Sequence, residues 1–277
     1  MGGAALNNLR VGNTGRKEIK KGNIYFLYIP LVKRLKSVYN LGMRKKCSVI
    51  LKALVVVISM LGIVLNLIFY ANDGYSFWYK RLLYFTTQSN LWIGITFLLY
   101  FILRLIEKKK GKALIGRWYY LMKYSFTVSI ALTGFIFCFG LAPFAEDGYH
   151  PWTIYSLMVH VFVPALSIAD FFVEESGVTF KRKEIAYSLI PPVYYLVFTI
   201  VVYLLGFDFG RGFNYPYFFL DFNSPAGFFG LAEAERPILG TAYWLVIMLM
   251  IVLIFGASLW ALHPENRKAR KQLKGKN

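Results

Sequence analysis

The stretch GTAYWLVIMLMIVLIFGASLWAL, residues 240–262, runs for 23 residues without a charged side chain. A helix needs about 20 mostly apolar residues to cross the hydrocarbon core of a bilayer. Five further apolar stretches of this length precede it, at 48–71, 82–106, 119–144, 152–174 and 185–206. The 277-residue chain is 57% hydrophobic, a share that few soluble domains reach. The sequence therefore predicts an all-α protein, a polytopic transmembrane helical bundle with six spans.

Lysine and arginine are distributed unevenly over the connections between these spans. Residues 1–47 carry eleven, and the segments 107–118, 175–184 and 263–277 carry five, three and six. The alternate connections carry four, which are Lys80, Arg81, Arg211 and Arg236. Because cytoplasmic loops are enriched in these residues, both termini are predicted to be cytoplasmic. The net charge of +18 thus reflects membrane topology and does not indicate a nucleic-acid partner.

The chain is predicted to form one transmembrane domain, 48–262, between a basic leader, 1–47, and a basic tail, 263–277. The leader is too long for the charged region of an ordinary cleaved signal, so the first span should remain in the mature protein. Its apolar run GNIYFLYIPLV, 22–32, suits either an interfacial segment or a basic tail without fixed structure. Met43 could also serve as the natural start, which would make residues 1–42 dispensable.

A long connection on the outer side, residues 207–239, contains ten Phe or Tyr residues punctuated by glycine and proline. Connections beyond about 12–15 residues without regular structure are uncommon and often functional. Aromatic residues also favour the headgroup layer. We therefore expect this outer segment, with Tyr215, Tyr217 and Asp221, to fold back over the bundle as a lid, or to form an aromatic belt.

Several kinds of site are not indicated by the sequence. The three histidines do not cluster with cysteines or carboxylates at metal-ligand spacings. No glycine-rich phosphate loop or dinucleotide fingerprint is present, so no cofactor and no metal is expected. Cys47 and Cys138 lie on different spans and are not expected to pair. Lys123, near the inner end of the third span, is expected to extend its ammonium group towards the interface.

The second span begins with LLYFTTQSNLW, residues 82–92, which places five consecutive polar side chains in an apolar segment. Thr87 and Asn90 share one helical face, and Gly94 follows one turn below and leaves room for a neighbouring helix. Thr86 shares the Asn90 side of the helix, whereas Gln88 and Ser89 turn away from it. Such side chains often join helices by hydrogen bonds, but a run of five also suggests a binding or catalytic site.

The fourth span places His160 about 12 Å along the helix from its outer end. Ionisable residues at such depth are rare and mark candidate functional sites, although a neutral buried histidine is the alternative. Ser156 and Ser167 share its stripe, with Asp170 at the edge. Pro164 removes the hydrogen bond that the His160 carbonyl would accept, which predicts a distortion of the helix there.

Topology places Thr87 and His160 at similar depth, because the second and fourth spans both run from outside to inside. A hydroxyl and an imidazole facing a bundle interior are the minimum requirement for nucleophilic attack on a carbonyl. Amide groups of Asn90 or Gln88 could stabilise an oxyanion. The pattern therefore suggests a nucleophile and a base, without fixing the distance between them.

Three motifs occur in a fixed order: LLYFTTQSNLW at 82–92, LMVHVFVPALSIADFF at 157–172 and NYPYFFLDFNSP at 214–225. Together they resemble the bacterial branch of the androgen-induced-protein family of six-span membrane proteins. The resemblance covers about residues 48–262. Animal members of that family are threonine hydrolases that cleave fatty acid esters of hydroxy fatty acids. The animal aspartate three residues after the threonine is replaced here by Asn90, which questions any role of that position that depends on charge.

The resemblance implies that Thr87 is the nucleophile and that His160, followed four residues later by proline, is the base. It implies a hydrolase of lipid esters in a bacterial plasma membrane, with membrane lipids or similar esters as substrates. Thr86, Gln88, Ser89 and Asn90 would support the site. The alternatives are a carrier that uses the polar interior as a solute path and a structural or signalling subunit.

Overall fold

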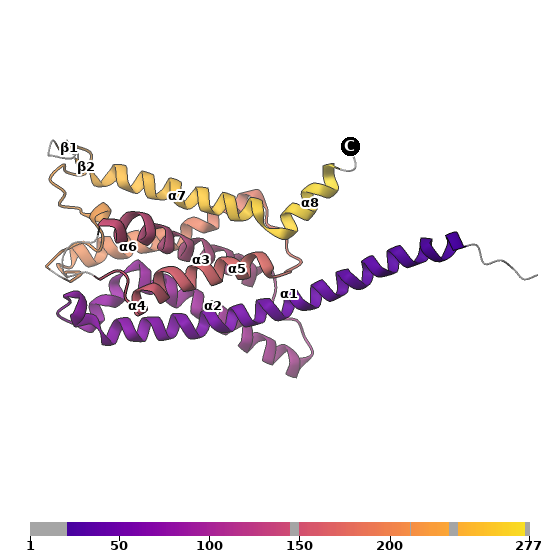
Figure 1. Ribbon diagram of the computed structural model, residues 1–277. Coiled ribbons are helices and arrows are strands. Elements are labelled where there is room, and N and C mark those ends of the chain that lie inside the picture. The colour runs from indigo at the N-terminus through magenta and orange to yellow at the C-terminus, as the bar shows by residue number, and fades with distance from the viewer. Residues whose placement is uncertain (1–20, 145–149, 211, 233–237, 275–277) are drawn as a thin grey trace, which may run out of the picture. The chain divides into compact units, whose positions relative to one another are not determined.

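The computed structural model describes residues 21–144, 150–210, 212–232 and 238–274, with side chains from residue 41 onward. The chain divides into two units, Met1–Met43 and Arg44–Asn277. In the first unit, residues 21–43 are helical, and the second unit is a bundle of helices (Figure 1).

The α-helices are α1 (Lys21–Ile68), α2 (Phe85–Lys110), α3 (Arg117–Ile136), α4 (Ile154–Leu157), α5 (Val163–Val173), α6 (Ile190–Leu204), α7 (Thr241–Leu262) and α8 (Pro264–Lys274). Short 3-10 turns are η1 (Tyr70–Asp73), η2 (Trp78–Leu83), η4 (Ala142–Phe144), η6 (Arg182–Leu189) and η7 (Phe218–Leu220), and π-helical turns are η3 (Phe137–Leu141) and η5 (Met158–Phe162). Two strands of two residues, β1 (Leu231–Ala232) and β2 (Ile238–Leu239), pair antiparallel in the outer segment.

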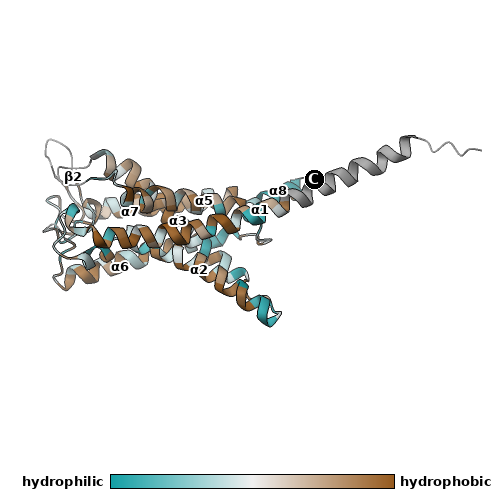
Figure 2. Cartoon of the chain, turned by 60° about the horizontal axis from the view of Figure 1, so that its bottom comes forward, coloured by the Kyte–Doolittle hydropathy of each residue, from teal (hydrophilic) through white to brown (hydrophobic). Residues whose placement is uncertain are grey.

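Six of these helical segments are long and apolar enough to cross a membrane. They are Leu41–Ile68, Phe85–Lys110, Arg117–Leu141, Ile154–Val173, Arg182–Leu204 and Thr241–Leu262. The predicted all-α, six-span fold is confirmed, and the protein is an integral, multi-pass membrane protein. Hydrophilic residues gather on α8 and at the end of α2, whereas the spans are largely hydrophobic (Figure 2).

Helix α3 lies at the centre of the bundle. In the most apolar 18-residue stretch of the span that contains α3, 61% is buried inside the protein, whereas in the corresponding stretch of α7 only 17% is buried. Tyr119, Tyr124 and Val128 of α3 belong to the main hydrophobic core, which also takes in residues of α2, α5, α6 and α7. A smaller core joins α1, α2, α3 and α5 and includes Val55 and Ile130.

Helices α1 and α2 approach each other closely at Gly94. A Cβ atom at Gly94 would lie 2.5 Å from Ser59 Oγ and 2.8 Å from Met60 Cε, so a side chain there would have to displace both groups. The prediction that Gly94 makes room for a neighbouring helix is confirmed. Because Thr87 and Asn90 share this face of α2, they too are directed into the bundle.

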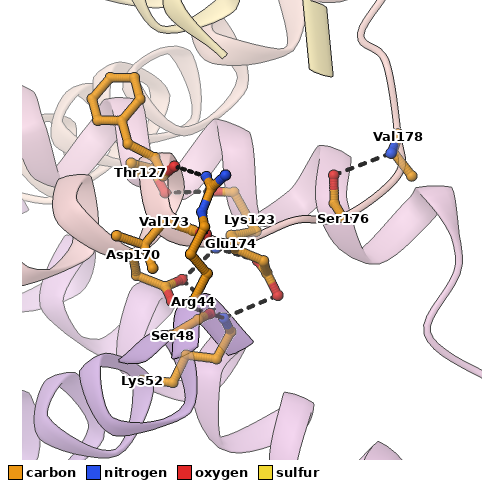
Figure 3. A network of polar contacts seen from close by, with 11 residues as sticks. Arg44, Ser48, Lys52, Lys123, Thr127, Asp170, Val173, Glu174, Ser176 and Val178 are labelled. Atoms are coloured by element: carbon orange, nitrogen blue, oxygen red, sulfur yellow. Dashed lines mark hydrogen bonds and ion pairs between the residues drawn. The ribbon is translucent and has the colours of Figure 1, made fainter. Parts of the chain in front are cut away.

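A network of four charged side chains joins α1, α3 and α5 near their inner ends (Figure 3). Lys52 Nζ lies 2.8 and 3.0 Å from the two carboxylate oxygens of Asp170 and 3.0 Å from Glu174 Oε1. Lys123 Nζ contacts Asp170 Oδ2 and Glu174 Oε2. Each carboxylate thus contacts both ammonium groups, which forms a closed ring with no net charge.

Two further side chains, those of Ser48 and Tyr100, lie against this ring. Ser48 Oγ donates to Asp170 Oδ1 at 2.6 Å and accepts from Lys52 Nζ at 2.6 Å. The Lys52 ammonium lies 4.8 Å from the ring centre of Tyr100, and aromatic faces attract cations. Asp170 and Lys52 are completely buried, and Glu174 is 8% exposed. Full pairing is required here, because an isolated charge would be very costly at this depth.

The structure corrects the expectation for Lys123. Its ammonium group does not extend to the interface; the side chain is 2% exposed and pairs with Asp170 of α5 and with Glu174, which directly follows that helix. The physical reason is that Asp170 and Glu174 lie one helical turn apart, so two carboxylates face α3 within reach of a lysine there. Sequence analysis also overlooked Lys52, whose position inside an otherwise apolar span was the available signal.

We predict that the Lys123→Met variant will be strongly destabilised, because two buried carboxylates would then face one ammonium group. Breaking a buried pair costs about 3–5 kcal/mol. The double variant Lys123→Met/Glu174→Gln restores neutrality and should melt at a higher temperature than the single variant. Apparent melting temperature of the purified protein in detergent measures both effects.

Arg104→Gln provides the control for this experiment. Arg104 pairs with Glu107 at 2.7 Å at the inner end of α2, but its side chain is 52% exposed, so its loss should change the melting temperature little. The predicted role of the ring is wrong if the double variant melts no higher than Lys123→Met. It is also wrong if Lys123→Met and the wild type have the same melting temperature.

Candidate functional site

The helix that carries His160 is interrupted where Pro164 predicts it. Residues Met158–Phe162 form a π-helical turn between α4 and α5, and Pro164 lies in the first turn of α5. Proline has no N–H group for the His160 carbonyl, so the backbone loses a regular hydrogen bond at this point. The predicted distortion is confirmed. Such π turns occur frequently at functional sites.

Three neighbouring helices hold this turn in place. Gly62 of α1 packs so closely that an added Cβ would lie 2.8 Å from Val159 Cγ1. Gly134 of α3 also packs against the turn. An added Cβ there would lie 3.0 Å from the His160 carbonyl oxygen and 3.0 Å from Pro164 Cβ. From α2, the Asn90 side-chain amide donates to the Val159 carbonyl at 2.9 Å. The backbone around His160 is therefore closely fixed.

The hydrogen bonds of His160 determine which ring nitrogen can act as a base. Nδ1 lies 2.9 Å from the Ser156 carbonyl oxygen and 3.1 Å from Ser156 Oγ. Because a carbonyl oxygen can only accept, Nδ1 must carry the proton, and Nε2 of the neutral ring then has a free lone pair. The ring also stacks on Phe137, with centroids 4.1 Å apart, and the residue is 9% exposed. This arrangement fixes the ring, and in the tautomer protonated on Nδ1 it leaves Nε2 as the acceptor.

Thr87 is the third residue of α2 and is 8% exposed. Within the described part of the chain its hydroxyl makes no hydrogen bond. Asn90 lies one turn further along the same face and contacts the carbonyl of the residue before His160. The structure thus brings the Thr87 face of α2 against the turn that carries His160. The first N–H groups of a helix also lack intrahelical partners, and Thr86 and Thr87 lie in that first turn.

The other polar residues of this run have separate contacts. Ser89 Oγ lies 2.8 Å from Thr133 Oγ1 and joins α2 to α3, as helix-joining hydroxyls do. Gln88 Nε2 donates to the Leu82 carbonyl at 3.2 Å, outside the core of the bundle. Asn90 Nδ2 donates both to Thr86 O and to Val159 O, so neither of its N–H groups is left for an oxyanion.

An apolar cavity lies beside this run, on the Thr86 side of α2. The cavity has a volume of about 80 Å³ and is partly open to the outside. Its polar lining residues include Thr86, Thr133 and Tyr217, whereas its walls are aliphatic and aromatic side chains of α3, α6, α7 and η7. Thr87 and His160 do not line it. An acyl chain fits the chemistry of such walls.

Parts of the outer segment fold back on the bundle. Phe209 is fully buried, and the Tyr217 hydroxyl lies 3.5 Å from Thr86 Oγ1 at the start of α2. An ion pair between Lys80 and Asp208 attaches this segment to η2 and holds the pKa of Asp208 below its usual value. Tyr217 therefore covers the Thr86 end of the cavity.

Tyr215 and Asp221 lie elsewhere in the outer segment. Tyr215 packs against Phe213, with ring centroids 5.2 Å apart. Asp221 Oδ1 accepts the Asn223 N–H at 2.9 Å and shapes a local turn. Neither residue lines the apolar cavity, in contrast to Tyr217. Among the residues that the structure describes, no group of three His, Cys, Asp or Glu side chains could hold a metal ion.

We predict that Gly134→Ala will disturb the turn around His160, because the new methyl group would press on the His160 carbonyl and Pro164. Overpacking of this kind costs about 1–3 kcal/mol. Gly140→Ala is the matched control, since the nearest atom to its added Cβ is 3.7 Å away. Melting temperatures should fall for Gly134→Ala and stay near wild type for Gly140→Ala; equal values for both would contradict this role of Gly134.

Comparisons with known proteins found no relative of this chain: no family model, no curated protein and no solved structure matches it. The resemblance drawn from the three sequence motifs therefore stays a prediction. What the structure contributes is the membrane-spanning fold and the local geometry around Thr87 and His160.

Proposed function

We propose that this protein is a membrane-embedded hydrolase that cleaves fatty acyl esters, with Thr87 as nucleophile and His160 as general base. The observation that carries this proposal is the 2.9 Å contact between His160 Nδ1 and the Ser156 carbonyl. It orients Nε2, the basic nitrogen, on a turn that Asn90 ties to the Thr87 face of α2. A threonine hydroxyl requires such a base, because it is a weak nucleophile by itself.

In the proposed reaction, the Thr87 hydroxyl oxygen attacks the acyl carbonyl carbon while its proton passes to His160 Nε2. The tetrahedral intermediate then expels the alcohol, which takes the proton from His160 and leaves an acyl ester on Thr87. A water molecule attacks this ester with the same histidine as base. The fatty acid leaves and the Thr87 hydroxyl is restored, so no oxidant, metal or cofactor is required.

The developing negative charge on the carbonyl oxygen requires hydrogen-bond donors. We assign this role to the backbone N–H of Thr87 in the first turn of α2, which has no carbonyl one turn earlier in the helix. The Thr86 N–H instead donates to the Tyr217 hydroxyl at 3.4 Å. The positive end of the helix dipole favours an anion there. Gln88 keeps one side-chain N–H beyond its bond to Leu82, so it is a second candidate donor.

The cavity supports a lipid-like substrate. Its walls are apolar, and Tyr217 and Thr86 stand at its polar end, next in sequence to Thr87. The part of a fatty chain nearest its ester group would occupy this space, with the ester directed towards the first turn of α2. This fits the family that the sequence resembles, and with it we propose membrane lipids or similar esters as substrates and a bacterial plasma membrane as the location.

The alternative, a carrier with a polar path, is favoured by Ser167. Its hydroxyl is fully buried on α5 between His160 and Asp170 and has no hydrogen-bond partner among the described residues. A continuous path would have to pass the ring of Lys52, Lys123, Asp170 and Glu174, in which every charge is paired. A closed neutral ring suits an anchor better than a transit site, so we favour the hydrolase.

We predict that Thr87→Val and His160→Gln will lose hydrolysis of a fluorogenic acyl ester by purified protein in detergent. Thr87→Val should fall to background, and loss of the base should reduce kcat/KM about 10²–10⁴-fold. Thr96→Val is the matched control: Thr96 lies on the same helix, is 1% exposed, and its hydroxyl donates to the Trp92 carbonyl at 2.8 Å. It should keep wild-type rates.

Equal rates in all four proteins, or a loss of activity in Thr96→Val equal to that in Thr87→Val, would reject the catalytic pair. Flux of a solute into liposomes without ester turnover would support the carrier. Thr86→Val serves as a further test, because activity abolished there and retained in Thr87→Val would move the nucleophile to the cavity side of α2.

A further inference from the structure

A groove at the opposite end of the bundle from the outer segment is lined by cationic side chains over an apolar floor. Its cations are Arg44 at the start of the first span and Arg267, Lys268 and Lys271 of α8, and its apolar residues include Phe172 of α5 and Leu262 at the end of α7. Because α5 ends at Val173 and α7 at Leu262, the groove lies where the spans leave the hydrocarbon.

Helix α8 is firmly attached to the bundle. Asn266 is 4% exposed; its amide nitrogen donates to the Trp260 carbonyl at 2.9 Å, and its amide oxygen accepts the Phe180 N–H at 2.8 Å. Trp260 Nε1 donates to the Phe180 carbonyl at 2.8 Å. The cations of α8 are therefore presented from a fixed helix rather than from a loose tail.

The arginine at the other side of the groove is also fixed. Arg44 donates to the carbonyl oxygens of Val173 at 3.2 Å and Phe172 at 3.0 Å, and pairs with Glu175 at 2.5 Å. Its guanidinium thus caps the end of α5, where a cation is favoured by the helix dipole.

The groove carries an excess of positive charge. Lys268 lies 3.1 Å from Glu265 and 3.8 Å from Glu175, so two carboxylates offset part of the charge. Arg267 and Lys271 are exposed and form no ion pair with the described residues. They are four residues apart on α8 and therefore share one face. Two cations remain available to a ligand.

We propose that this groove binds the phosphate head group of an anionic phospholipid from the cytoplasmic leaflet. Arg267 and Lys271 would contact the phosphate, and the acyl chains would lie along Leu262 and Phe172. Leu262 is 50% exposed at this depth and would otherwise be left uncovered beside the head groups. Basic residues beside a membrane span attract anionic lipids, and an apolar floor suits a lipid rather than free phosphate. This proposal does not depend on ester hydrolysis.

The test compares lipid retained by the purified full-length protein after incubation with mixed micelles of phosphatidylglycerol and phosphatidylcholine. Arg267→Gln/Lys271→Gln should retain several-fold less phosphatidylglycerol than the wild type. Lys108→Gln/Lys109→Gln removes the same charge from exposed residues at the inner end of α2 and should retain wild-type amounts. Arg267→Lys keeps the charge and should retain most of the binding. Because Arg267 and Lys271 are exposed, melting temperatures should not change.

Two results would overturn the proposal. Equal loss in the two double variants would mean that overall surface charge, and not this groove, attracts the lipid. Displacement of the retained lipid by millimolar inorganic phosphate, or equal retention of phosphatidylcholine, would mean that the groove does not recognise an anionic phospholipid. Neither result affects the Thr87 and His160 experiments, so the two proposals fail separately.

Discussion

The pairing of two lysines with two carboxylates inside the bundle is the constraint on which the arrangement of α1, α3 and α5 depends. None of the four groups can leave its partners without leaving an uncompensated charge at low dielectric. The ring therefore fixes the rotation of three helices about their own axes, because each must direct its charged side chain to one point. Hydrophobic packing in a lipid solvent has no comparable directional preference.

The charge ring also constrains the outer half of the bundle, because α5 and α3 extend from the ring to the turn that carries His160. Asp170 and Glu174 fix the inner end of α5, whose outer end continues into the π turn that carries His160. Lys123 fixes α3, whose Gly134 then packs on that same turn. The position of His160 thus depends on a charge ring about three to four helical turns away along the fourth span. Its tautomer depends on the local Ser156 carbonyl.

Much of the fold could be predicted from the sequence, because length and hydropathy alone determine whether a segment can cross a bilayer. The distortion before Pro164 and the close approach at Gly94 were also predictable, since both follow from the chemistry of one residue. The ring of charges was not: a lysine within a span can reach the interface or turn inward, and only the neighbouring helices decide. The cavity beside Thr86, rather than beside Thr87, likewise depends on side chains from four separate helices.

The polar residues at the start of α2 have different roles in the structure. Ser89 joins α2 to α3 and Thr86 lines the apolar cavity. The Thr87 hydroxyl makes no hydrogen bond among the described residues, and it lies on the face of α2 from which Asn90 contacts the turn that carries His160. The most direct measurement is mass spectrometry of the protein after incubation with a hydrolase-directed acylating or phosphonylating probe. A covalent adduct on the peptide that contains Thr87, absent when His160 is replaced, is the result we predict. An adduct at another residue, or turnover without any adduct on that peptide, would contradict the assignment of Thr87 as nucleophile.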